Sequence, residues 1–294
     1  MENRLIIIDS NALLHRSFHA LPPLVMRSGQ ETGAVYGFLL TLFKAIKDLD
    51  PKYIVACFDT KAKTFRHEKF QEYKAQRPLT PSGIISQIPI TKDVLGTFKV
   101  PVFAKDGFEA DDLIATICNL VQKENKDLEI YILTGDLDNL QLVNEKIKVY
   151  TLGKGIKDTV IYDINKVKER FQVNPDQMVD FKALTGDPSD NIPGVEGIGK
   201  KTAAEIIQRY KTIENLYEEL ATDTAVLKPK VKEALKQNKK TAIMSKELVK
   251  MKNDVDIDFI IKDCEFGLFD KKNIEKKLND LEFNSLVNRI PYNV

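Results

Sequence analysis

Short apolar runs and longer amphipathic stretches alternate along the first half of the chain. Residues 5–8, 53–58 and 129–133 are rich in β-branched and aromatic side chains, which predicts strands buried on both faces. Residues 11–20, 34–49 and 82–98 have the apolar spacing of helices with one buried face. Strands that alternate with helices predict an α/β fold, with a mostly parallel central sheet flanked by helices.

The second half of the chain has a different pattern. After about residue 163 the strand signals stop, and the rest is predicted to be helical. We therefore expect an α/β core over residues 1–165 and a helical region over residues 166–294. Residues 228–252 are rich in lysine. This segment is either a basic face along a duplex or a solvated helical hairpin, and the sequence favours neither.

Composition narrows the class of protein. With 294 residues, of which 43% are hydrophobic and 30% charged, the chain is long enough for a sizeable core. A net charge of +1 does not by itself indicate a nucleic-acid partner. The three cysteines are far apart and fit neither a disulfide framework nor a zinc site, which predicts a reducing cytoplasmic compartment. We expect no signal peptide and no membrane partner, since no apolar run approaches the ~20 residues of a membrane span.

Acidic residues follow the predicted strands. Asp9 ends the first strand, Asp59 follows the second, and Asp136 lies just past the third. Any one of them is most simply a turn residue, because Asp bonds its own backbone there. The carboxyl ends of parallel strands, however, share one edge of the sheet, where ligands bind. Three carboxylates at equivalent strand ends therefore predict a common site.

A further acidic stretch begins a predicted helix with Glu109, Asp111 and Asp112. Helix capping is the simpler explanation for this stretch taken alone. Asp138 and the pair Asp187 and Asp190 add more acids. Carboxylates gathered in one cleft repel one another unless cations join them, and sites made only of oxygen suit Mg²⁺ or Mn²⁺.

Two basic features accompany the acids. Residues 61–77 interleave lysines and arginines with aromatic residues, and we favour phosphate binding slightly over a merely solvated amphipathic helix. Residues 197–201 read Gly-Ile-Gly-Lys-Lys and precede a helix that ends near Tyr210. Such a hairpin frees backbone N–H groups for a phosphate, with Ile198 anchoring the turn in the core. A bare Gly-x-Gly is weak, but the whole string from residue 187 to 204 is more specific.

Several long motifs resemble the 5′→3′ exonuclease domain of bacterial DNA polymerase I, within the flap endonuclease superfamily. They are IIIDSNALLHRSFHALPPL, GAVYGF, ACFD, FRHEKFQEYKAQR, FEADD, LTGDLDNLQLV and TGDPSDNIPGVEGIGKKTA. The resemblance implies a PIN-like or resolvase-like nuclease core with a helical arch at about residues 61–98. It also implies a helix–three-turn–helix, or helix-hairpin-helix, motif at about residues 187–210. No polymerase portion is present, and whether the nuclease is free-standing or part of a polymerase stays open.

The resemblance also implies roles for individual residues. The first metal site would be Asp9, Asp59, Glu109 and Asp111. The second would be Asp136, Asp138 and Asp187, with Asp111 or Asp112 near both sites and Asp190 close by. Tyr73, Lys74 and Arg77 would act at the active site from the arch. The DNA-binding residues would be Arg66, Lys74, Arg77, Gly197, Gly199, Lys200, Lys201 and Thr202.

The implied activity is a metal-dependent 5′→3′ exonuclease and structure-specific 5′ flap endonuclease on DNA, used in replication and repair. Two Mg²⁺ ions, replaceable by Mn²⁺, would activate water and stabilise the leaving oxygen, and a K⁺ ion would sit at the hairpin. The expected partners are DNA with 5′ ends or flaps and a DNA polymerase. The protein is expected to be a monomer that acts at the nucleoid in the cytoplasm. Two alternatives remain. The first is a protein that binds branched DNA without cleaving it, which the complete set of acidic residues disfavours. The second is a small ribonuclease of the toxin type, which the length of the chain and the hairpin after Asp190 disfavour.

Overall fold

A computed structural model of the chain describes residues 2–153 and 158–291 and contains a six-stranded central sheet. The strand order is β3-β2-β1-β4-β5-β6, in which β6 alone is antiparallel to its neighbour. The strands are β1 (Glu2–Asp9), β2 (Pro51–Cys57), β3 (Val102–Phe103), β4 (Glu129–Leu133), β5 (Ile147–Leu152) and β6 (Thr159–Tyr162). The mostly parallel sheet and three predicted strands are confirmed. The pattern did not reveal β3 and β6, because they are short strands at the two edges, or β5, because lysine and threonine interrupt its apolar residues.

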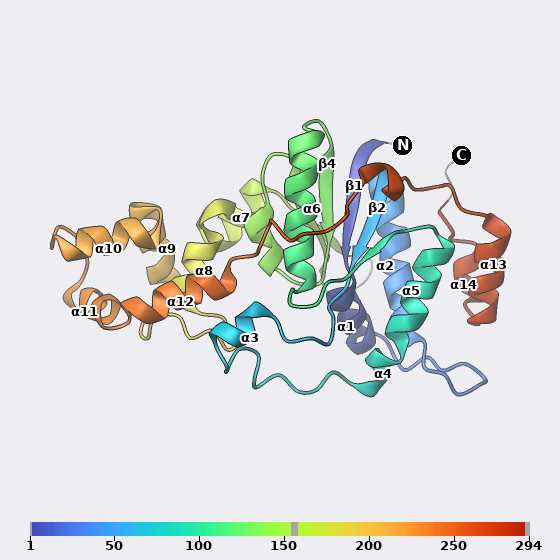
Figure 1. Cartoon of the computed structure of the whole chain (residues 1–294), viewed down its shortest axis with the longest axis horizontal. Helices are drawn as coiled ribbons and strands as arrows, with labels where there is room; N and C mark the ends of the chain where they lie inside the picture. The colour runs from blue at the N-terminus through green and yellow to red at the C-terminus, as the bar shows by residue number, and fades with distance from the viewer. Residues whose placement is uncertain (1, 154–157, 292–294) are drawn as a thin grey trace.

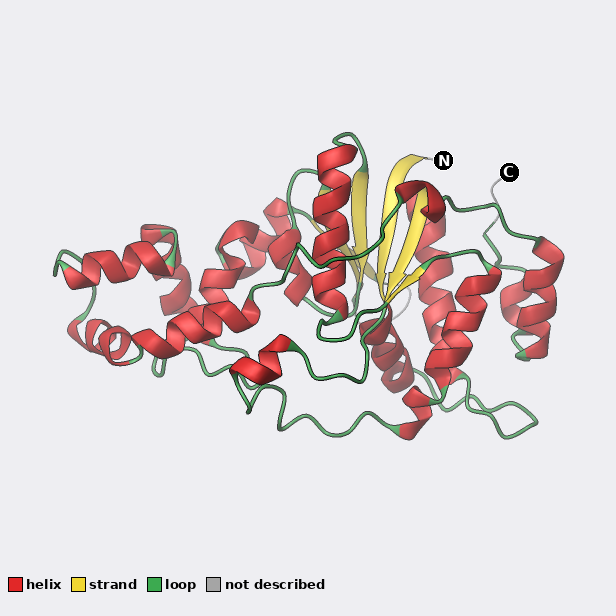
Figure 2. Ribbon diagram, viewed as in Figure 1, coloured by secondary structure: helices red, strands yellow, loops and turns green. Residues whose placement is uncertain are grey.

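Helices cover both faces of the sheet (Figure 2). Alternate residues of β1 point to opposite faces, so Leu5 and Ile7 join one buried cluster while Ile6 and Ile8 join the other. On the first face lies α6 (Ala110–Glu124). On the second face lie α1 (Ser10–Ala20), α2 (Gly33–Leu49) and α5 (Gln87–Thr97).

The register of the strands brings the predicted acidic edge together. Asp9 pairs with Cys57, and Ile8 pairs with Leu133. The chain therefore reaches Asp59 and Asp136 within three residues of those neighbouring strand ends. The common edge expected from the sequence is confirmed.

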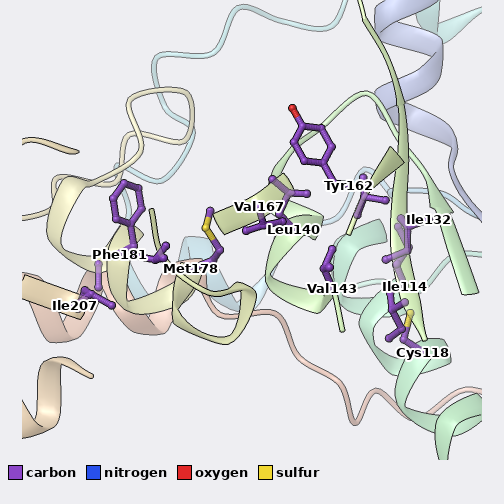
Figure 3. Close-up of a cluster of buried hydrophobic side chains, with 14 of the residues drawn as sticks. Ile114, Cys118, Ile132, Leu140, Val143, Tyr162, Val167, Met178, Phe181 and Ile207 are labelled. Atoms are coloured by element: carbon purple, nitrogen blue, oxygen red, sulfur yellow. The ribbon is translucent and has the colours of Figure 1, made fainter. Parts of the chain in front are cut away.

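The helical half projects from the sheet at the left of Figure 1. After α7 (Ile164–Phe171) it consists of η2 (Pro175–Gln177), α8 (Met178–Thr185), α9 (Lys200–Tyr210), α10 (Ile213–Ala221), α11 (Pro229–Gln237) and α12 (Lys239–Val249). One buried cluster runs without a break from Ile114 on α6 to Ile207 on α9 (Figure 3). The two halves therefore share a core. In the part of the chain that the structure describes, no helix is long and apolar enough to cross a membrane.

The last residues do not belong to the helical half, contrary to the expected 166–294 region. After α12 the chain returns along α6, where the Val255 amide donates to Thr116 Oγ1 at 3.1 Å. It then forms η3 (Ile261–Cys264) beside β2, and α13 (Lys271–Asp280) and α14 (Asn284–Val287) at the opposite end of the molecule (Figure 1). Leu278 and Phe283 are buried in the same cluster as Phe38 of α2. The apolar spacing in this part of the sequence predicts helices, but it does not show which part of the protein they pack against.

The expected helical arch at residues 61–98 is only partly helical. Helices are α3 (Phe65–Lys69), α4 (Ser82–Ile85) and α5, and residues 70–81 contain none. Residues 72–77 instead lie against the loop at 188–191. The Lys74 amide donates to Asp190 O at 2.9 Å, and Asn191 Nδ2 donates to Glu72 O at 2.7 Å. These long-range bonds replace the helical ones, and Lys74 takes a positive φ of 56°.

Candidate active site

Asp9 lies at the centre of the acidic edge, at the end of β1. Its Oδ2 accepts from Thr134 Oγ1 at 2.6 Å and its Oδ1 accepts from the Ala12 amide at 3.1 Å. The residue is 4% exposed. Burial, and then the neighbouring Asp59 and Asp136, raise the pKa of Asp9 to about 7. A carboxylate in this position gains from a cation.

Asp111 faces the same space from the first turn of α6. Burial raises its pKa well above the usual range, and Asp9, Asp136 and Asp138 add to the effect. Asn139 Nδ2 donates to Asp111 Oδ1 at 2.8 Å. The Oδ1 of Asn139 is buried and has no partner among the described residues. Asn139 was not predicted, because an amide escapes a search for carboxylates; its only signal was its place inside LTGDLDNLQLV.

Lys182 joins two predicted metal ligands and was also missed. Its Nζ forms ion pairs with Asp138 and, at 2.8 Å, with Asp187. Burial and Asp136 nevertheless raise the pKa of Asp138 to about 7. Burial also favours a raised pKa at Asp187, but Lys182 and the Ser189 donors outweigh it and lower that pKa to about 2. The single lysine of α8, close to Asp187 in the sequence, was the available signal.

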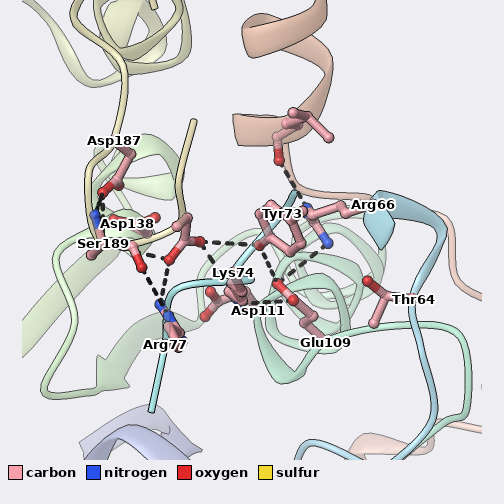
Figure 4. A network of polar contacts seen from close by, with 12 residues as sticks. Thr64, Arg66, Tyr73, Lys74, Arg77, Glu109, Asp111, Asp138, Asp187 and Ser189 are labelled. Atoms are coloured by element: carbon pink, nitrogen blue, oxygen red, sulfur yellow. Dashed lines mark hydrogen bonds and ion pairs between the residues drawn. The ribbon is translucent and has the colours of Figure 1, made fainter. Parts of the chain in front are cut away.

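The predicted arch residues meet the acids in a second network (Figure 4). Lys74 Nζ lies 2.7 Å from Glu109 Oε1 and 3.7 Å from Asp190 Oδ2. Arg77 forms an ion pair with Asp190. The Tyr73 hydroxyl lies 3.1 Å from Glu109 Oε2 and 3.0 Å from Asp190 Oδ2. The sequence therefore correctly placed Tyr73, Lys74 and Arg77 beside the acids, while Tyr73 is only 3% exposed and orients carboxylates here.

Arg66 and Asp112 are placed differently from the prediction. Arg66 donates to both oxygens of Asp112, at 2.7 and 2.8 Å, and both residues are buried. The Asp112 side chain also accepts the Glu109 amide at 3.1 Å, which is helix capping. In this structure Arg66 and Asp112 are paired with each other and buried, so neither side chain is open to DNA or to a metal ion, and their assigned roles stay predictions. The capping explanation holds for Asp112.

The acidic edge fits a divalent cation by chemistry but is not arranged around one. Among residues 2–153 and 158–291, no three Asp, Glu, His or Cys side chains are gathered closely enough to hold a metal ion. The chain's own donors hold several of the carboxylates instead: Lys182, Lys74, Arg77, Thr134 and Asn139. The all-oxygen donor set and the raised pKa values at Asp9 and Asp111 suit Mg²⁺ or Mn²⁺.

The predicted hairpin precedes α9. Gly197 has a φ of 80°, a conformation that favours glycine, and Ile198 is 5% exposed, so its expected anchoring in the core is confirmed. Gly199 is the N-cap residue of α9 and provides no side-chain cap, while Lys200 and Lys201 are exposed and Thr202 is half-buried. Exposed residues with two ammonium groups at a helix N-terminus have the chemistry that suits a phosphate group.

Two family models together match most of the chain. Residues 4–172 match the "5'-3' exonuclease, N-terminal resolvase-like domain", and residues 173–272 match the "5'-3' exonuclease, C-terminal SAM fold". The chain belongs to the 5′-3′ exonuclease family. It is accordingly a nuclease, and the two family domains meet at residues 172 and 173.

Curated relatives of this exonuclease are DNA polymerases I. The protein from Bacillus subtilis is 36% identical over 287 residues, and that from Mycobacterium bovis is 38% identical over 288 residues. These alignments cover 98% and 97% of this chain but 32% and 31% of the relatives. The chain therefore spans about a third of the length of the polymerases that it matches.

Solved structures show that the exonuclease has the flap endonuclease fold. T5 5′-exonuclease with bound zinc aligns with a TM-score of 0.68 at 22% identity, covering 96% of this chain and 99% of that one. The catalytic core of Rad2 in complex with DNA aligns at 0.63 and 16%, covering 99% and 93%. Flap endonuclease-1 from Methanococcus jannaschii aligns at 0.59 and 18%, covering 98% and 91%.

Proposed function

We propose that this exonuclease hydrolyses DNA from 5′ ends and at 5′ flaps with the help of two divalent cations, Mg²⁺ with Mn²⁺ as a substitute. The observation that carries the proposal is the acidic edge. Buried carboxylates with raised pKa values face one another at the carboxyl end of a parallel sheet, beside a basic turn. Related chains of this fold have been solved with zinc and with DNA.

The proposed ligands fall into two groups. Asp9, Asp59, Glu109 and Asp111 would hold one ion, and Asp136, Asp138 and Asp187 the other, with Asp190 nearby. When bound, such a pair of ions supplies an activated water and stabilises the leaving 3′-oxygen. Thr134 and Asn139 orient Asp9 and Asp111 toward that position.

The basic turn supplies charge at the phosphate. The Lys74 ammonium and the Arg77 guanidinium already lie at the acidic edge, bound to Glu109 and Asp190. We propose that both shift to the scissile phosphate when DNA enters, because a phosphate offers stronger charge-assisted bonds than carboxylates occupied by metal ions. Tyr73 keeps Glu109 in place during this exchange.

The hairpin would grip the duplex backbone beyond the site. The exposed amides at Gly197 and Gly199, together with Lys200, Lys201 and Thr202, contact phosphates, which carry no base sequence. Recognition should therefore follow DNA structure rather than sequence. We further propose that a K⁺ ion binds this hairpin.

The cellular setting is also a proposal. Relatives of which this chain covers only about a third are named DNA polymerase I, which supports a DNA polymerase as partner, within the same polypeptide or outside it. We propose that the nuclease acts as a monomer, in the cytoplasm at the nucleoid, in replication and repair.

Cleavage of a 5′-labelled flap duplex tests the function directly. The assay compares Mg²⁺ with EDTA, and the flap with a blunt duplex and a free single strand. Metal-dependent cuts near the flap junction are expected. Tight flap binding without cleavage under Mg²⁺ or Mn²⁺ would instead establish a structure-specific binder, and Asp136→Ala would then change nothing. Under our proposal, Asp136→Ala abolishes cleavage and preserves binding.

A further inference from the structure

Arg66 is a buried cation that ties three distant segments together. It comes from α3 and is 2% exposed. Its Nη1 and Nη2 donate to Asp112 on α6 at 2.7 and 2.8 Å. Its Nε donates to Leu248 O at 2.8 Å, and Nη2 also donates to Lys250 O at 3.3 Å, at the end of α12. The guanidinium thus has no face left for a phosphate.

Asp112 is equally occupied. Its Oδ1 accepts from Arg66 and from the Lys252 amide at 2.8 Å, while its Oδ2 accepts from Arg66 and from the Glu109 amide at 3.1 Å. These four bonds use the lone-pair positions of a carboxylate, and the residue is 0% exposed. Asp112 is therefore unavailable to a metal ion, although its neighbour Asp111 faces the acidic edge.

The same contacts lead from the hairpin to the active-site acids. Ser245 on α12 accepts from the Gly194 amide at 3.2 Å, just ahead of the hairpin. The end of α12 holds Arg66, and Arg66 holds Asp112. Asp112 fixes the Glu109 amide, and the Glu109 side chain binds Lys74 at 2.7 Å. Each link is a direct hydrogen bond or ion pair.

We propose that Arg66 and Asp112 are positioning residues, a rigid joint that holds Glu109 and the turn carrying Lys74 in register with the DNA-gripping helical half. This inference rests on the proposed nuclease function and adds a device for its site. The guanidinium fork suits the task, because its planar donors fix two carbonyls and a carboxylate in one geometry. A lysine keeps the charge but cannot make this set of bonds.

The main test is Arg66→Lys, assayed on a 5′ flap under single turnover with the enzyme saturating. We expect the cleavage rate to fall at least tenfold while the Kd for the flap in Ca²⁺ changes less than threefold. The number and affinity of Mn²⁺ ions, measured by calorimetry without DNA, should stay within twofold of wild type. Raising Mg²⁺ should not restore the rate. Weaker flap binding with a shallower salt dependence would show that Arg66 contacts DNA and would overturn the proposal.

Asp112→Asn separates positioning from metal binding. It should keep the Mn²⁺ stoichiometry of wild type, whereas Asp111→Asn should reduce it. Loss of a Mn²⁺ ion in Asp112→Asn, with rescue by high Mn²⁺, would make Asp112 a ligand and overturn the assignment. Wild-type cleavage in the same assay shows that a negative result concerns the joint and not the proposed function.

A merely structural role is tested by the paired variant Arg66→Met/Asp112→Leu. Apolar replacement of a buried ion pair commonly preserves folding, and thermal melting checks this. We expect a folded protein that still cleaves at least tenfold more slowly. Recovery of the wild-type rate would overturn the proposal; if the paired variant does not fold, Arg66→Lys decides alone.

The matched control is Glu247→Gln. It breaks the exposed salt bridge to Lys69 between the same helices, which is 2.7 Å long, and should change neither the cleavage rate nor the melting temperature measurably.

Discussion

Two groups of acids at one edge of the sheet differ in what balances their charge. Asp9 and Asp111 have hydrogen-bond donors but no ion pair in the part of the chain described, and the pKa of Asp9 is about 7. Asp187 lies beside Lys182 and its pKa is about 2. The same residue type in one cleft thus titrates differently, according to its partner. The first group is prepared for an external cation, while the second carries a cation of its own.

Substitution of Asp111 should show the largest effect. Asp111→Asn removes a proposed ligand, so flap cleavage should fall at least about a hundredfold. It also removes a buried charge that its neighbours repel, so the metal-free protein should gain about 1 kcal/mol of unfolding free energy. Urea unfolding in EDTA and the flap assay measure the two effects. If the variant were both less active and less stable, the Asp111 carboxylate would not be a destabilising charge that awaits an external cation.

The pH dependence of stability separates Asp9 and Asp138 from Asp187. Asp9 and Asp138 have folded pKa values of about 7, above the ordinary aspartate value of 3.8. Their unfolded forms ionise first as the pH rises, so the metal-free protein should lose unfolding free energy, on the order of a few kcal/mol, between about pH 4 and 7. Urea unfolding at pH 5 and pH 8 in EDTA measures the difference.

Asp187 should behave in the opposite direction. Its folded pKa of about 2 lies below 3.8, so its stabilisation is present above pH 4 and is lost only as the pH falls toward 2. Asp9→Asn should flatten the slope between pH 4 and 7 and leave the acid limb unchanged. An unchanged slope in Asp9→Asn would show that Asp9 is not the group responsible.

Lys182→Met tests the internal cation. The substitution leaves Asp138 and Asp187 without their shared ammonium group. Because the Lys182 side chain is 16% exposed, we expect the free energy of unfolding to fall by about 2 kcal/mol, less than for a fully buried pair. Mg²⁺ should then raise the melting temperature of this variant more than that of wild type, since an external ion replaces the lost charge. If Mg²⁺ raised the melting temperature of both proteins equally, Lys182 would not share its carboxylates with the metal ion.

The smallest effect is expected at the hairpin, away from both groups. Lys200→Gln/Lys201→Gln should weaken flap binding about tenfold and reduce the slope of log K against log salt by about 2, one per lost phosphate contact. The single-turnover rate at saturating enzyme should be unchanged. Fluorescence anisotropy over a salt series measures the slope. A changed cleavage rate with unchanged flap affinity would contradict the proposal that these lysines bind the duplex backbone.

The sequence alone determined those features that local chemistry encodes. The runs of apolar residues gave the buried strands, and the acids that follow them gave the edge, because a parallel sheet aligns its carboxyl ends whatever the details of packing. The apolar residue between two glycines likewise identified Ile198 as the anchor of the hairpin. Helix capping at Asp112 was also foreseeable from its place in the first turn.

Only the tertiary structure decided which charges meet. Arg66 and Asp112 are 46 residues apart, and Arg66 and Leu248 are 182 apart, so no periodicity links them. A pattern of bases in residues 61–77 cannot distinguish Arg66, which is buried at 2% exposure, from Arg77, which lies at the surface. The same holds for Lys182 and for the packing of α13 against α5. Burial removes water from a charge and makes its partner decisive, and that partner is set by the fold.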